Sequence, residues 1–180
     1  MPLTPLLFLS PRVPWPLNTG AKIRTHALLS ALRERFAVHY AGFLQPDLPR
    51  RDAEEYLQGL ASATLHAERA RSLPAKGWLA LRTLADRRPV TIAKYWHAAL
   101  AARVRRWIDE HPDGIIHADH LHMAPYLELG RPALAVMDEH NVESQIVERM
   151  AQQYRGRPQH AYLRLQAGRM RAFEARMIGH

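Results

Sequence analysis

The chain of 180 residues contains no cysteine, which excludes disulfide bonds, thiolate nucleophiles and cysteine-ligated zinc. A reducing, cytoplasmic location fits this composition. The chain also lacks the roughly 18 to 20 consecutive apolar residues that a membrane-spanning helix needs. No basic residue precedes the apolar run near the N-terminus, and prolines and Arg12 follow it directly. This run therefore predicts a first buried strand and not a signal peptide.

Acidic residues are scarce relative to basic ones: 17 Asp and Glu stand against 25 Lys and Arg, and the formal net charge is +8. Nearly all of the positive charge is arginine, which binds phosphates and carboxylates through a fork of donors. A nucleotide or an anionic membrane is a candidate partner, although arginines spread along a chain are also typical of a solvated surface. No motif that reads nucleic acid is present, so nucleic acid is not an expected partner.

Short apolar or β-branched runs alternate with longer segments of helical period, which predicts one α/β domain built on a parallel sheet with flanking helices. The apolar content of 47% is enough for a packed core. The predicted strands are 6–10, 37–43, 63–66, 114–118 and 133–137. The predicted helices are 21–35, 51–60, 75–86, 95–110, 120–129, 142–154 and 158–177.

The last predicted helix carries Arg164, Arg169, Arg171 and Arg176 against a single acid, Glu174. A basic, weakly amphipathic helix can lie on a membrane surface. The sequence also stops at this helix without a capping residue or a polar tail. The alternative is therefore that the chain is a piece of a larger protein and that the helix leads to a missing partner.

The first predicted strand leads into the segment PRVPWPLNTGAKIRTH, where three prolines restrict the backbone and make the loop stiff. Asn18 or Thr19 can cap the following helix, and Gly20 lets a ligand approach the backbone. The free amides at a helix start attract anions, and Lys22 and Arg24 add positive charge there. The same pattern is also an ordinary capping signal.

Histidines and acids follow the fourth and fifth predicted strands, where ligands of parallel sheets bind. Strand alternation places His117 and Asp119 on one side, and a turn brings His120 toward the strand ends. Glu139 and His140 follow the fifth strand. General acid or base chemistry and plain helix capping both remain open for these residues. No HExxH or comparable spacing is present, so a metal ion is not expected.

Three segments together resemble the N-terminal half of a GT-B glycosyltransferase of the large retaining family 4. PRVPWPLNTGAKIRTHALLSAL is similar to the proline loop and first helix of that family. GIIHADHLHMAPYL is similar to its fourth-strand edge, and AVMDEHNVESQIVERMA is similar to its fifth strand, closest to sugar transferases of exopolysaccharide clusters. The resemblance covers essentially the whole chain and implies a Rossmann-like fold.

The resemblance also implies roles for individual residues, with two departures from the family pattern. Many relatives carry two adjacent glycines where this chain has Thr19 and Gly20, and a second histidine where it has Asp119. The implied catalytic residues are His140 and Asp119. The implied residues for the substrate and the donor phosphates are Thr19, Gly20, Lys22, Arg24, His117 and Glu139.

By this resemblance, residues 1–180 are expected to be the acceptor-side domain of a longer enzyme. The complete enzyme transfers a sugar from a nucleotide sugar to a polysaccharide or lipid-linked envelope acceptor. Relatives bind most of the donor in a second domain with a Glu-x7-Glu element, which has no match here. The donor is a substrate, and no cofactor or metal is expected. A cytoplasmic enzyme in contact with the inner membrane fits this role; the alternative is a non-catalytic basic module that binds an anionic or lipid-linked ligand.

Overall fold

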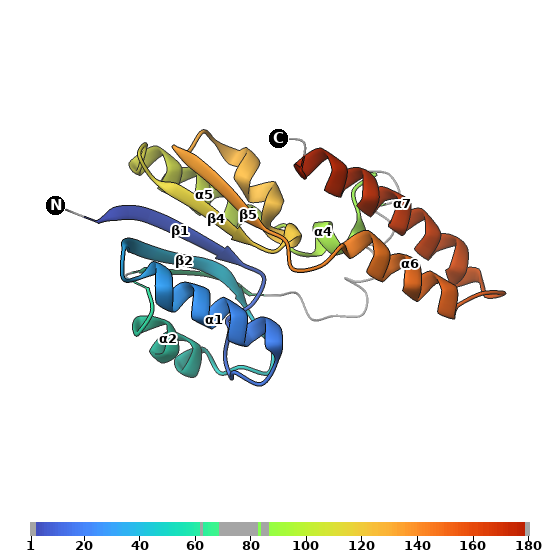
Figure 1. The fold of residues 1–180 in the computed structure, drawn as a ribbon, viewed down its shortest axis with the longest axis horizontal. Coiled ribbons are helices and arrows are strands. Elements are labelled where there is room, and N and C mark those ends of the chain that lie inside the picture. The colour runs from blue at the N-terminus through green and yellow to red at the C-terminus, as the bar shows by residue number, and fades with distance from the viewer. Residues whose placement is uncertain (1–2, 62, 69–82, 84–86, 179–180) are drawn as a thin grey trace. The chain divides into compact units, whose positions relative to one another are not determined.

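The computed structural model describes residues 3–61, 63–68, 83 and 87–178, and it divides the chain into two compact units (Figure 1). The first unit comprises Met1–Arg71 and Trp96–Asp138, and the second comprises Ser72–Tyr95 and Glu139–His180. The helix predicted at 75–86 lies, apart from one residue, outside the described residues. Each unit is described by itself below.

The first unit is built on a five-stranded sheet in which every neighbouring pair of strands is parallel. The strand order is β3-β2-β1-β4-β5, so the chain changes direction across the sheet between β1 and β4. Ligands of open parallel sheets bind at such a switch point, outside the carboxyl ends of the strands. The strands are β1 (Thr4–Ser10), β2 (Phe36–Leu44), β3 (Ala63–Glu68), β4 (Ile115–Asp119) and β5 (Leu134–Asp138).

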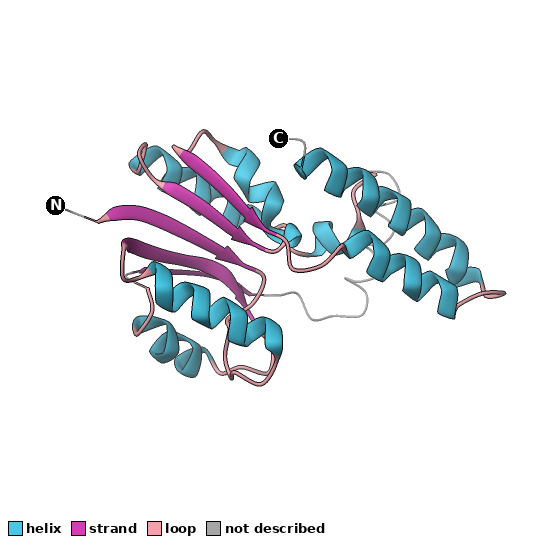
Figure 2. Cartoon of the chain, in the orientation of Figure 1, coloured by secondary structure: helices cyan, strands magenta, loops and turns pink. Residues whose placement is uncertain are grey.

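Helices flank the sheet of the first unit on both faces (Figure 2). The helices α1 (Gly20–Leu32) and α2 (Arg50–Gln58) cover one face, where Leu29 and Leu57 join Phe8 and Tyr40 in one buried cluster. On the other face lies α5 (Ala98–Glu110), whose Trp107 contacts His39 of β2. This confirms the predicted α/β, Rossmann-like fold, and all five predicted strands are present.

The segment predicted as a helix at 120–129 differs in type from the prediction. It forms a 3₁₀ helix, η1 (Leu121–Leu129), with Pro125 inside it. Proline has no backbone N–H and its ring collides with the preceding turn of an α-helix, so a regular α-helix is disfavoured there.

The second unit contains α4 (Val90–Lys94), α6 (Glu143–Gln153) and α7 (Pro158–Ile178). The helices α6 and α7 pack against each other, and α7 also holds α4, because the Gln166 side-chain oxygen accepts a hydrogen bond from Val90 N at 2.8 Å. The helix α4 was not predicted, since five residues are too few to show a helical period. Among the described residues, every helix is too short or too polar to cross a bilayer.

Two histidines and a tryptophan form an aromatic cluster beneath the second face of the sheet. The ring of His39 lies 5.6 Å from that of Trp107 and 5.3 Å from that of His111, and the last two rings stack at 4.5 Å. Burial, and then the neighbouring His111, lowers the pKa of His39. Protonating His39 therefore costs more in the folded protein than in the unfolded chain.

We predict that this cluster makes the protein less stable in mild acid. Because the folded pKa of His39 is depressed, its contribution is fully present above the unfolded value of about 6.5 and is lost as the pH falls through the lower folded value. In His39→Phe the ring remains but the proton site is gone. Urea unfolding from pH 7.5 down to pH 5 should therefore show a smaller loss of stability in the variant than in the parent. Equal losses in both proteins would contradict the prediction.

Candidate functional site

The carboxylate of Asp119 lies at the carboxyl edge of the sheet, on the strand next to the central strand β1. Asp119 ends β4 and is 0% exposed. Its Oδ2 accepts hydrogen bonds from Ser10 Oγ at 3.1 Å and from Thr25 Oγ1 at 2.8 Å. Asp119 thereby connects the end of β1, the end of β4 and the helix α1. His117 and Asp119 lie on the same side of the sheet, as strand alternation predicted.

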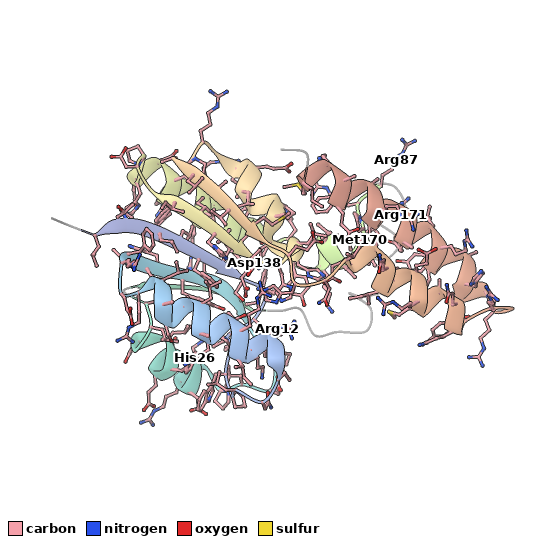
Figure 3. All side chains as sticks on the ribbon, in the orientation of Figure 1. Arg12, His26, Arg87, Asp138, Met170 and Arg171 are labelled. Atoms are coloured by element: carbon pink, nitrogen blue, oxygen red, sulfur yellow. The ribbon has the colours of Figure 1, made fainter. Side chains whose placement is uncertain are left out.

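A second carboxylate, that of Asp138, binds Arg24, the residue of α1 that precedes Thr25. Asp138, labelled in Figure 3, ends β5 and is the register partner of Asp119. Arg24 Nη2 donates to both of its oxygens, at 2.7 and 2.9 Å, and the Arg24 side chain is 55% exposed. The predicted anion-binding arginine is thus engaged by a carboxylate. A guanidinium has five N–H donors, so the exposed part of Arg24 still has donors for a ligand.

The start of α1 shows which of the two candidate residues, Asn18 or Thr19, caps the helix. Thr19 is the capping residue, because its Oγ1 accepts from Lys22 N at 3.4 Å. The Lys22 ammonium donates to Trp15 O at 3.2 Å and to Asn18 Oδ1 at 3.1 Å. Lys22 therefore fastens the loop to the helix, which uses donors that the sequence assigned to an anionic ligand.

Side chains from β2 and the loop after it fix the rest of the opening loop. Tyr40 Oη donates to Arg12 O at 2.7 Å, and the amide of Gln45 pairs with both backbone groups of Val13, at 2.6 and 2.9 Å. The three prolines of the loop already restrict its backbone. The loop is therefore held by hydrogen bonds as well as by its own covalent geometry.

Two glycines at this edge meet different constraints. A Cβ on Gly42, the register partner of Ser10, would lie 2.5 Å from Ser10 O and 2.6 Å from Tyr40 Oη, so a larger residue does not fit. A Cβ on Gly20, the first residue of α1, would meet no heavy atom within 4 Å. The fold leaves open space at Gly20, as the prediction of close ligand approach requires.

The predicted ligand residue His117 lies within the sheet. It is 8% exposed, and its ring stacks on Phe8 of β1 with a centroid separation of 5.0 Å and an interplanar angle of 6°. Phe8 is its register partner and also stacks on Tyr40. His117 thus belongs to a row of cross-strand aromatic contacts, which gives it a packing role.

His120 follows β4 with an unusual backbone conformation. It is 5% exposed, and its φ of 106° and ψ of 142° lie where side chains other than glycine are rarely found. Such a conformation costs on the order of 1–3 kcal/mol. Its N–H donates to Asp138 O at 2.9 Å, and its ring centroid lies 6.1 Å from that of His122. The predicted turn toward the strand ends is confirmed.

Glu139 and His140 belong to the second unit. Both precede α6, and the N-cap residue of that helix, Val142, makes no side-chain capping hydrogen bond. The cap comes from α7, where the buried Glu174 accepts a hydrogen bond from Ser144 N at 2.9 Å. Burial, followed by the charges of Glu174 and Glu143, raises the pKa of Glu139.

The structure gathers six of the eight predicted site residues in the first unit, and it adds others that sequence reasoning did not select. Ser10 and Thr25 have the appearance of an ordinary strand end and helix position, although Thr25 stands four residues before Leu29, a spacing that puts its hydroxyl on the buried face of α1. Glu174 lies 30 residues from Ser144, the residue that it caps, so no local pattern reveals it. The six gathered residues are Thr19, Gly20, Lys22, Arg24, His117 and Asp119.

Comparison with known proteins gives no relative for this chain. No protein-family model, no curated protein and no solved structure matches it.

We predict that Asp119 contributes more to folding than its register partner Asp138. Hydrogen bonds to a buried charged group contribute about 1.5–3 kcal/mol each, whereas exposed ion pairs contribute about 0–1 kcal/mol. Asp119→Ala should therefore lower the free energy of unfolding by about 2 kcal/mol or more, and Asp138→Ala by less than about 1 kcal/mol. Urea titrations of both variants measure the difference. Equal losses in the free energy of unfolding would contradict the prediction that Asp119 contributes more to folding than Asp138.

A further prediction concerns the carboxyl pair of the second unit. Because the folded pKa of Glu139 is raised, its stabilising contribution is present at low pH and is lost as the pH rises above the ordinary value of about 4.3. Glu139→Gln removes the charge and nearly keeps the size and shape of the side chain. The variant should be more stable than the parent at pH 7 and similar to it at pH 4, as measured by thermal unfolding.

Glu148→Gln is the matched control, because Glu148 is 45% exposed and pairs with Arg171 at 2.7 Å on the surface. This control should show no gain in stability at pH 7. If Glu139→Gln is no more stable at pH 7 than the control, burial and the neighbouring charges of Glu174 and Glu143 do not make the ionised Glu139 destabilising.

Proposed function

We propose that this chain is the acceptor-side domain of a GT-B glycosyltransferase resembling retaining family 4. In the complete protein, a sugar is transferred from a nucleotide sugar to a polysaccharide or lipid-linked envelope acceptor. A second Rossmann-like domain, outside this chain, binds most of the donor. The enzyme works in the cytoplasm, in contact with the inner membrane surface, and needs neither a metal ion nor a cofactor.

One observation carries this proposal: the three segments on which the resemblance rests meet at one edge of the sheet. Ser10 and Thr25 from the first segment bind Asp119 from the second. Arg24 from the first binds Asp138 from the third. This edge is where a parallel sheet takes its ligand. The agreement between sequence resemblance and spatial convergence supports a common site.

Roles for Gly20, Arg24 and Asp119 follow from their positions at this edge of the first unit, and the role of His140, in the second unit, follows from the resemblance. The open backbone at Gly20 and the exposed guanidinium of Arg24 suit the negative donor phosphates. Asp119 is fully buried and bonded to two hydroxyls, so its role is to position α1 and not to react. His140 is the proposed polar contact to the transferred sugar, where a hydrogen bond that strengthens in the transition state lowers the barrier.

The proposed function predicts turnover by the complete protein and its dependence on His140. The longest protein whose reading frame contains residues 1–180 should release nucleoside diphosphate from one of a panel of uridine and guanosine diphosphate sugars, with EDTA present or absent. His140→Ala should lower kcat about 100- to 1,000-fold, the usual effect of losing one transition-state donor. Its thermal midpoint should stay close to that of the parent.

His160→Ala is the control in the same unit, because the His160 ring contacts Ala151 O at 2.8 Å and joins α6 to α7. This variant should lose stability and keep kcat. A His140→Ala enzyme within about threefold of the parent would leave the role of His140 without support. A parent that retains an anionic lipid-linked ligand but releases no nucleotide would favour the binding-module alternative.

A further inference from the structure

The backbone of His120 lies in a conformation that glycine would adopt at lower cost. Among the described residues, the non-glycine residues with positive φ are Arg87, at 54°, and His120, at 106°. The value for Arg87 is close to the left-handed helical region, which other residues also visit. The combination of φ 106° and ψ 142° at His120 is outside that region and is close to the one used almost only by glycine.

The turn itself does not require a histidine. The hydrogen bond that crosses from β4 to β5 at this point is formed by His120 N and Asp138 O, which are backbone atoms. Any residue with an N–H can make this bond, and glycine would make it without strain. A histidine therefore occupies a position where the backbone conformation favours glycine and where the hydrogen bond of the turn needs no side chain.

Strain of this kind persists where the surrounding structure enforces it, and it is concentrated at functional sites. His120 stands directly after the buried Asp119, at the edge where a parallel sheet takes its ligand. From this placement and this conformation we infer that His120 is a catalytic residue of the carboxyl edge, whose imidazole hydrogen bonds a hydroxyl group of the bound sugar substrate. This role rests on the proposed function and was not among those implied by the resemblance.

The chemistry of the neighbourhood favours a hydroxyl over an anion at this position. The carboxylate of Asp119 is adjacent in sequence, and the backbone of Asp138 is bonded to His120 itself. The Asp138 carboxylate is paired with Arg24, but the buried charge of Asp119 disfavours a further anion at the end of β4. A hydroxyl, in contrast, can donate to or accept from an imidazole nitrogen.

The experiment compares His120→Gly with His120→Ala in the complete protein. Both substitutions remove the imidazole, but alanine keeps the Cβ and hence the strain. At an ordinary position alanine is the more stable of the two. Here the glycine variant should have the higher thermal midpoint. Arg87→Gly (Arg87 is labelled in Figure 3) is the control for relief of positive φ in the second unit, and it should leave kcat unchanged.

Turnover provides the second readout. Both His120 variants should lose kcat by about a hundredfold, with a smaller change in KM. Added imidazole should restore part of the turnover in His120→Gly, where the missing ring leaves space, which a merely structural role would not produce.

Two outcomes would overturn the inference. A higher midpoint for the alanine variant would show that the position is not strained, and a glycine variant within about threefold of the parent in kcat would show that the ring is not used. Absence of turnover in the parent would instead contradict the proposed function. The order of the two midpoints is still readable in that case and decides whether His120 is held against its backbone preference.

Discussion

The buried carboxylate of Asp119 is the contact on which the geometry of the site depends. A charge without solvent is costly unless hydrogen bonds compensate it, and here hydroxyl groups from two other elements, β1 and α1, turn toward it. The next residue of α1, Arg24, binds the next strand end at Asp138. Because Thr25 and Arg24 are adjacent, α1 cannot slide along the sheet without losing both contacts.

The positive charges at the start of α1 bind groups of the protein itself. Lys22 and Arg24 were candidates for binding an anion, and each has a partner within the protein. Their first effect is to fix the loop and the helix in place. What the loop can offer a ligand is therefore rigidity: open space over Gly20 and a half-exposed guanidinium, both in set positions before binding. Preorganisation of this kind reduces the entropy lost on binding.

The sequence predicted the elements of the fold well, because their signals are local. The apolar runs predicted all five strands, and the threonine before Gly20 was one of two predicted caps. Contacts between distant residues could not be predicted in the same way. Neither Asp119 with Thr25 nor Glu139 with Glu174 has a spacing that any period encodes. The five-residue helix α4 and the 3₁₀ geometry around Pro125 are likewise set by neighbours and sterics and not by repetition.

Gly42 on β2 and His120 after β4, the strands on either side of β1, show two different reasons for a residue type at this edge. At Gly42, on β2, the neighbouring strand and the Tyr40 hydroxyl leave no room for a Cβ, and the residue is glycine. At His120, after β4, the backbone again favours glycine, yet a histidine is present. Gly42 thus follows the rule that a residue type suits the space around its backbone. A histidine that departs from this rule, directly after a buried carboxylate at the ligand-binding edge, is best explained by what its side chain does.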